Sequence, residues 1–198
     1  MARDGFVGVD NLHLAKMTDT EKLTYETPVH IEGLVEIKAE RSVSDDASYA
    51  DDQPWITAHS DTGGTGTLSI RDPNITQEVR NLLAELSGYL VTSEGDLLAT
   101  DRPPVPCAVM CQQTGYIHGR KKLFYWAELG KPDFDATTKE DKVTVGQIDF
   151  PFTFKPVTLA DDVRATTRDS FYGSTTYATF FDKVVTTSAE AEKTSTGA

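Results

Sequence analysis

The chain has 198 residues, of which 31 are Asp or Glu and 19 are Lys or Arg, so its formal net charge is −12. With 38% apolar and 25% charged residues, it can bury enough surface to fold, and we predict a single domain over residues 1–198. The acidic balance disfavours ordinary nucleic-acid binding, because a negatively charged surface repels phosphates.

No apolar run approaches the roughly 20 residues that cross a bilayer, and the segment after Met1 lacks the apolar core of a signal peptide. We therefore expect a soluble protein made in the cytoplasm, with no membrane partner. The two cysteines, Cys107 and Cys111, alternate with other residues in a strand-like pattern. Four residues of strand span about 13 Å, which exceeds the reach of a disulfide, so we predict two buried free thiols.

The N-terminal half begins with two apolar segments that indicate strands. The first runs from Phe6 to Met17. The second runs from Val29 to Ala39, where apolar residues alternate with charged and polar ones. This period of two predicts a half-buried strand.

Residues 42–64 break this periodicity, since they contain five aspartates, no Lys or Arg, and the breakers Pro54, Gly63 and Gly64. We predict a long acidic loop here, and we interpret the glycine-rich stretch from Gly63 to Gly66 as its flexible hinge. Loops of this length are uncommon in compact domains and usually functional or disordered. Its aromatic residues favour a surface that another molecule covers. The candidate contact residues are Asp45, Asp46, Tyr49, Asp51, Asp52 and Trp55.

One amphipathic helix is predicted next, after a short strand over residues 65–71. Asn74 and Gln77 imitate a capping box, and Gly88 suits the C-terminal cap. The apolar stripe has helical spacing and must lie on a sheet. It consists of Ile75, Val79, Leu82, Leu83 and Leu86.

Three more strands are predicted, over residues 105–111, 122–129 and 142–154. In the last, the inward face switches near Gly146 and Gln147, which predicts a β-bulge. Pro151 has no backbone donor, so one side of this strand should lie at a sheet edge or beside a break in pairing.

The fold class that follows is mainly β, an antiparallel β-sandwich or partly closed barrel with one flanking α-helix. After Pro156, an aromatic cluster between Phe171 and Val184 should pack on the domain. The polar tail from about Ser188 should not pack.

Residue patterns typical of catalysis or of cofactor binding are lacking. Four scattered histidines have no metal-ligand spacing, and the glycines at 63–66 lack the lysine of a phosphate-binding loop. No serine lies in a nucleophile elbow. We therefore expect no enzyme, no catalytic residue, no metal and no cofactor. The aspartates of 42–64 leave an alternative open, a calcium- or carbohydrate-binding β-sandwich module of a virion or cell surface.

Several segments taken together resemble the major tail proteins, or tail tube proteins, of siphophages. They follow one another in the order of that family and span most of residues 8–155. They are residues 8–16, 25–29, 49–52, 64–70 with the helix that ends at Gly88, and 139–147. The resemblance implies a tail tube fold and a structural role in the virion. It also extends, in architecture, to the tube proteins of type VI secretion systems.

The resemblance further implies hexameric rings that stack into a conduit for genome ejection, with residues 42–64 as an inter-ring loop. Double-stranded DNA would pass through the lumen without specific binding. Implied partners are other copies of the chain and the tail terminator, distal tail and tape measure proteins, in a tail assembled in the host cytoplasm. The chain is longer than the usual family member, which makes about 160–198 a C-terminal extension with a flexible end.

Overall fold

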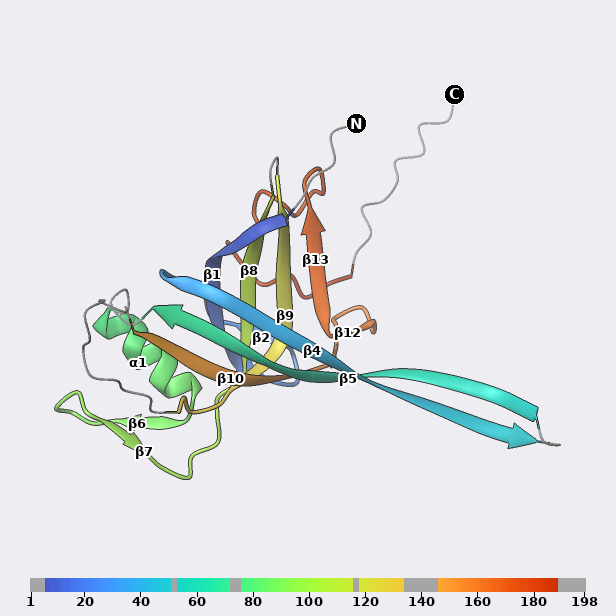
Figure 1. Cartoon of the computed structure of the whole chain (residues 1–198), viewed down its shortest axis with the longest axis horizontal. Coiled ribbons are helices and arrows are strands. Elements are labelled where there is room, and N and C mark those ends of the chain that lie inside the picture. Colours follow the sequence, from blue (N-terminus) through green and yellow to red (C-terminus); the bar gives the residue numbers. More distant parts are fainter. Residues whose placement is uncertain (1–5, 51–52, 72–75, 116–117, 134–145, 189–198) are drawn as a thin grey trace, which may run out of the picture.

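The structure is a computed structural model that describes residues 6–50, 53–71, 76–115, 118–133 and 146–188. For Phe6 and for residues 44–50 and 53–59, it describes the backbone only. Figure 1 shows a body of crossing strands, with one helix at one end and a long two-stranded hairpin leaving at the other.

Most of the described chain is β-strand. The strands of the main sheet are β1 (Phe6–Asp19), β2 (Thr24–Tyr25), β3 (Val29–Ile31), β4 (Leu34–Ala50), β5 (Gln53–Arg71), β8 (Cys107–Gly115), β9 (Arg120–Leu129), β10 (Gln147–Lys155) and β13 (Thr167–Phe171). The remaining elements are α1 (Gln77–Leu86) and the small hairpins β6 (Tyr89–Val91) with β7 (Leu97–Ala99), and β11 (Val157–Thr158) with β12 (Arg164–Ala165).

The main sheet is antiparallel and has the order β2-β1-β8-β9-β10-β5-β4, with β3 on β1 and β13 on β9. It divides at β9. One edge of β9 pairs with β8, whereas the other pairs with β13 near Phe124 and with β10 from Trp126 to Leu129. The strands β1, β8 and β13 thus form one layer, and β10, β5 and β4 cross it as a second (Figure 1). The predicted mainly β antiparallel fold with one helix is confirmed, and within the described residues the sheet does not close into a barrel.

The main core lies between the two layers, and α1 covers one end of it. Strand β10 contributes Phe150, Phe152 and Phe154, which are buried, while its alternate residues are exposed, as predicted. The rings of Phe152 and Phe154 lie edge-on to Phe124 at 5.7 and 5.1 Å between centroids. The helix adds Leu83 and Leu86 to the same cluster.

A second core lies on the other face of the first layer. Here Leu159 and Phe180 of the C-terminal segment pack with Met110 and Tyr125. Strand β8 is therefore buried on both faces from Cys107 to Cys111. The prediction that the aromatic cluster between Phe171 and Val184 packs is confirmed for Phe180, Phe181 and Val184, whereas Phe171 and Tyr172 are exposed. Residues 189–198 of the tail lie outside the described residues.

The predicted strand from Val29 to Ala39 is wrong as a single element. It is two strands, because Gly33 has a φ of +88° and turns the chain between them. Strand β3 pairs with β1, and β4 pairs with β5. Ile31 is buried, but Val29 and Val35 are exposed, so the expected apolar face is not continuous.

The predicted helix is confirmed, but its start differs. The N-cap is Thr76, whose hydroxyl accepts a hydrogen bond from Val79 N–H, and the proposed capping box at Asn74 is wrong in position. Gly88, with a φ of +75°, follows the helix as predicted for a C-terminal cap. Among the described residues, no helix has both the length and the hydropathy of a membrane-spanning segment.

The prediction for Pro151 is confirmed. Its carbonyl accepts a hydrogen bond from Gly130 N–H at 2.6 Å, but proline cannot return one, and the ladder with β9 begins only at the next residue, Phe152. The predicted bulge near Gly146 and Gln147 depends on residues 142–145, which lie outside the described residues.

Candidate assembly surface

The β4–β5 hairpin extends well beyond the body. Strand β10 accompanies β5 only as far as Gly64, the partner of Phe154, whereas β4 and β5 continue to pair until Ala50 meets Gln53. We call residues 43–61 of this hairpin the arm. At about 3.4 Å per residue, the arm is about 25 Å long. In Figure 1 it projects from the body as a two-stranded ribbon.

The predicted loop over residues 42–64 is therefore wrong as secondary structure. Most of it belongs to β4 and β5, in a register that runs from Ser42 opposite Gly63 to Ala50 opposite Gln53. Gly64 and Gly66 are not a hinge either. They pair with Phe154 and Phe152, and a Cβ on either glycine would come within 2.6 Å of the facing phenylalanine ring.

The arm begins at a β-bulge. Ser42 faces Gly63 and Val43 faces Asp61, so Thr62 is the extra residue, and its hydroxyl donates to Ser42 O at 2.8 Å. Gly63 has a φ of +99°, and a Cβ there would lie 2.0 Å from Phe154 O. Only glycine fits this position, where the arm leaves the three-stranded part of the sheet.

Asp61 holds this root to the C-terminal segment. Its carboxylate accepts hydrogen bonds from Gly63 N–H at 3.0 Å and from the Thr166 hydroxyl at 2.8 Å, and Arg41 lies 3.6 Å away. Partial burial opposes ionisation of Asp61, but these donors and the charges of Arg41 and Arg164 outweigh it and hold its pKa below the usual range. The arm root is therefore stabilised by an ionised carboxylate.

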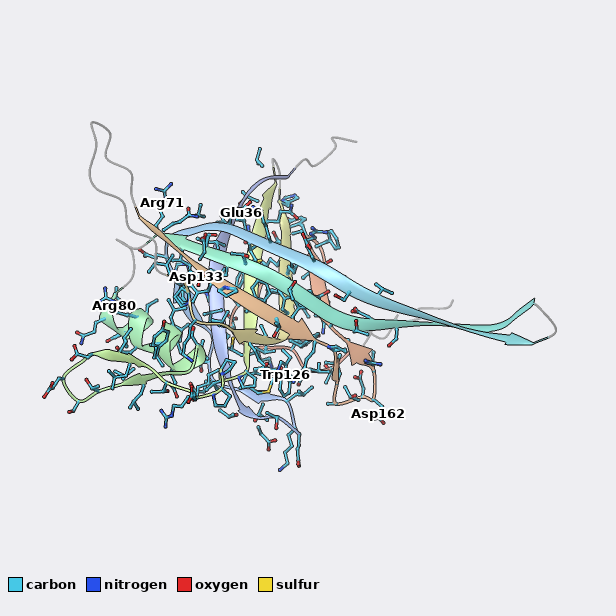
Figure 2. All side chains as sticks on the ribbon, turned by 60° about the horizontal axis from the view of Figure 1, so that its bottom comes forward. Glu36, Arg71, Arg80, Trp126, Asp133 and Asp162 are labelled. Carbon is cyan, nitrogen blue, oxygen red and sulfur yellow. The ribbon has the colours of Figure 1, made fainter. Side chains whose placement is uncertain are left out.

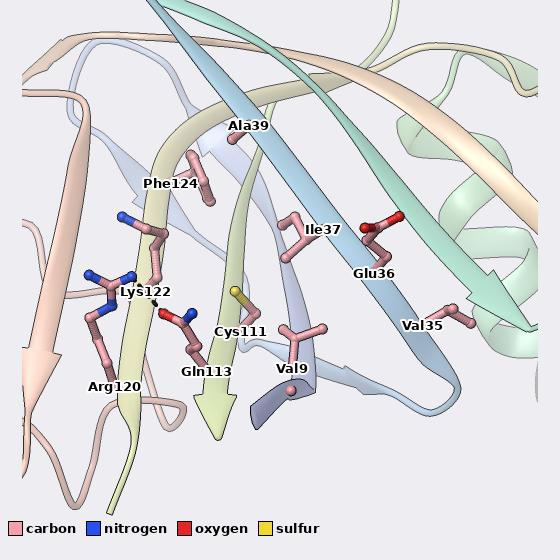
Figure 3. A pocket seen from close by; sticks show the side chains of 11 residues that line it. Val9, Val35, Glu36, Ile37, Ala39, Cys111, Gln113, Arg120, Lys122 and Phe124 are labelled. Carbon is pink, nitrogen blue, oxygen red and sulfur yellow. Dashed lines mark hydrogen bonds between the residues drawn. The ribbon is translucent and has the colours of Figure 1, made fainter. Parts of the chain in front are cut away.

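A groove opens between the edge strand β4 and the first layer (Figure 3). Its volume is about 460 Å³. Ile37 and Ala39 of β4 form one wall, and Val9 and Phe124 lie across from them. The groove thus exposes part of the apolar space between the layers beside the outermost strand of the sheet.

Two cations lie on the β9 side of the groove. Lys122 Nζ is 2.8 Å from an oxygen of Asp169, and Arg120 lies 3.9 Å from the other oxygen of the same carboxylate. Arg120 also donates to Gln113 Oε1 at 2.6 Å (Figure 3). Two positive charges therefore share one carboxylate at this site.

The outer face of the second layer is polar. Glu36, Lys38 and Glu40 of β4 lie on it, next to threonines of β5 and to Asp149 of β10. Figure 2 shows Glu36 on this sheet and Arg71 at the end of β5 that is far from the arm. Lys38 pairs with Glu36 at 2.9 Å, and Lys155 pairs with Glu128 at 3.3 Å, so both lysines of this face in the described chain have carboxylate partners.

The six candidate contact residues do not all fall in the described part of the chain. Asp45, Asp46 and Tyr49 belong to the arm strand of β4, and Trp55 to that of β5. The backbone of Asp45 pairs with that of His59, and Asp46 with Ala58. The side chains of these residues, and Asp51 and Asp52 altogether, lie outside the described residues.

Sequence patterns did not identify the residues that hold the arm or line the groove. Asp61 was counted among the acidic residues, but its partner Thr166 is 105 positions away. The only local signal was Asp61 followed by Gly63 and Gly64, a composition typical of a turn or bulge. The sequence around Lys122 did not indicate a surface site, because Lys122 lines the groove only where β9 faces Ile37 of β4.

The two cysteines are free and buried, as predicted. Burial raises the pKa of each thiol to about 12, so neither is a nucleophile at neutral pH. Within the described residues, no three or more His, Cys, Asp or Glu side chains are grouped so that they could hold a metal ion.

Comparison with models of known protein families and with curated protein sequences gives no match to this chain.

Proposed function

We propose that the chain is the structural subunit of a bacteriophage tail tube. In this tube, six copies form each ring, and the rings stack into a conduit for genome ejection. The observation that carries the proposal is the arm, a two-stranded extension of the sheet without a core of its own. The order and spacing of the segments that resemble siphophage tail tube proteins support the same function.

An isolated two-stranded hairpin is at best marginally stable in water, and unpaired strand edges readily pair with other chains. Within the described residues, each arm strand pairs only with the other. Strand β4 is also the outermost strand of the sheet along the body. Contacts from another copy would cover the arm and pair with the open edge of β4. Head-to-tail contacts of this kind close into rings or continue as filaments.

The polar outer face of the second layer suits a wall along which DNA moves. Its lysines already have carboxylate partners, and Glu40 and Asp149 add negative charge. Carboxylates repel phosphates over a range close to the screening length of about 8 Å at physiological salt. We assign this face to the lumen of the tube.

A shortened arm tests the proposal. Ser44 and Ser60 are register partners, so residues 45–59 can be replaced by an Asn-Gly turn that closes a tight hairpin and retains Asp61. We expect a folded chain that no longer forms stacked rings, because the body lies outside the deletion. Circular dichroism would check folding, and electron microscopy with sedimentation velocity would measure assembly.

The matched control is a chain in which residues 45–59 keep their length but have a scrambled order. Its failure to assemble, together with assembly of the wild-type chain, would show that the arm acts through specific contacts. Stacked tubes from the shortened chain would contradict the proposal.

A further inference from the structure

We infer that residues 164–167 are a brace that fixes the direction of the arm relative to the body, and that the arm swings about its root when the brace is released. The inference concerns a single copy of the chain, so it stands or falls independently of the proposed tube. The brace joins β12 to β13, and Figure 1 shows these strands beside the point where the arm leaves the body.

The brace contacts both strands of the arm root. On the β5 side, the Thr166 hydroxyl donates to the Asp61 carboxylate at 2.8 Å, and the Arg164 guanidinium donates to the Asp61 carbonyl at 3.4 Å. On the β4 side, the Arg41 guanidinium donates to the Thr167 hydroxyl. These contacts restrain the root through groups that do not belong to the β4–β5 ladder.

The root is the place where the arm can bend. Strand β10 accompanies β5 as far as Gly64, so the sheet narrows there from three strands to two. A two-stranded ribbon twists more readily than a wider sheet, and a β-bulge such as the one at Thr62 bends its strand. Over an arm of about 25 Å, a swing of about 20° at the root moves the tip by about 9 Å.

The brace is itself held by the body. Thr166 is 5% exposed, and its carbonyl accepts a hydrogen bond from Tyr125 N–H at 3.3 Å. Thr167 pairs with Phe124 of β9, and Ala165 packs against the second core. The brace therefore connects the arm root to a central strand of the first layer.

The segment that carries the brace is closed on itself. Arg168, which directly follows the brace, donates to Thr187 O at 2.7 Å. Asp161, three residues before the brace, accepts a hydrogen bond from Ser188 N–H at 2.7 Å. Both sides of the brace are thus tied to residues 187–188, so the brace is not part of a free loop.

Distances between two nitroxide labels, measured by pulsed electron spin resonance, test this inference. Ser48→Cys labels the arm, and Lys22→Cys labels the exposed turn between β1 and β2. Cys107 and Cys111 are buried, and the chain without added cysteines checks that they stay unlabelled. An excess of unlabelled chain restricts the measurement to distances within one copy.

We expect one narrow distance distribution for the labelled chain with an intact brace. Arg164→Ala combined with Thr166→Val removes both side-chain contacts of the brace with Asp61 and should widen the distribution by about 9 Å, the displacement for a swing of about 20°. Circular dichroism would check folding. If the double variant does not fold, Thr166→Val alone carries the test and should give a smaller widening.

Ser170→Ala is the matched control. It also removes a buried hydroxyl from β13, but this hydroxyl bonds to Ser174 within the C-terminal segment and not to the arm root. The control should leave the distribution narrow. Three results would overturn the inference: a distribution that stays narrow in the folded brace variant, one that is already wide with the brace intact, or an equal widening in the control.

Discussion

Asp61 joins the arm root to a segment more than 100 residues later in the chain. Its carboxylate accepts hydrogen bonds from Gly63 and Thr166, and Arg41 and Arg164 lie close to it. Because an ionised carboxylate makes stronger hydrogen bonds than a neutral one, the strength of these contacts at the arm root depends on the charge of Asp61.

Replacement of Asp61 should therefore have a pH-dependent effect. The pKa of Asp61 is lowered in the folded chain, so its stabilisation is present above the ordinary value of 3.8 and is lost as the pH falls through the lowered pKa. We expect Asp61→Asn to reduce the free energy of unfolding by about 1 kcal/mol at pH 7. Urea titrations at pH 7 and pH 3 would measure the difference, which should shrink at pH 3. A difference of equal size at both values would exclude an ionised carboxylate as the cause.

Gly63 offers a test of the bulge that needs no change of charge. A methyl group at this position would overlap Phe154 O, and the φ of +99° is unfavourable for any other residue, so Gly63→Ala should cost about 3 kcal/mol. Gly173→Ala is the matched control, since its φ is +95° but nothing lies within 4 Å of the added atom. It should cost about 1 kcal/mol. Similar melting temperatures for the two variants would mean that the sheet at Gly63 adapts to the methyl group.

At the scale of elements, sequence patterns succeeded where one face is buried and the other is solvated. The alternation of Phe150, Phe152 and Phe154 predicted the inward face of β10, and the stripe ending at Leu86 predicted the helix. The arm was missed for the opposite reason. Its strands pair with each other outside the core, so no buried face imposes alternation on residues 43–61.

Two further features were not predicted, for equally physical reasons. Strand β8 is buried on both faces, because the C-terminal segment covers the face opposite Cys107 and Val109. The groove could not be predicted either. It combines Ile37 of β4 with Lys122 of β9, and only the division of the sheet at β9 brings these strands face to face.

The C-terminal segment should prove integral to the fold. Phe180 is 1% exposed and packs in the second core, so Phe180→Ala should lower the free energy of unfolding by about 3 kcal/mol. Tyr172→Ala, at a side chain that is 63% exposed, is the control and should cost less than about 1 kcal/mol. Thermal unfolding followed by circular dichroism would measure both. Loss of no more stability at Phe180 than at Tyr172 would show that residues 160–188 are dispensable for folding.

On the scale of the whole molecule, the arm is a projecting surface without a core of its own, and the proposed tube would cover it with other copies. Under the proposed function, the edge of β4 along the body, which has no further strand beside it within the described residues, would provide a second contact line between copies. The acidic composition then places negative charge on any channel that the copies enclose.

Electron microscopy of the purified chain over a range of concentrations tests this account most directly. We predict sixfold rings and hollow tubes of stacked rings, in which density for each arm reaches the adjacent copy. A chain that remains monomeric at every concentration, with or without preformed tubes as seeds, would contradict it.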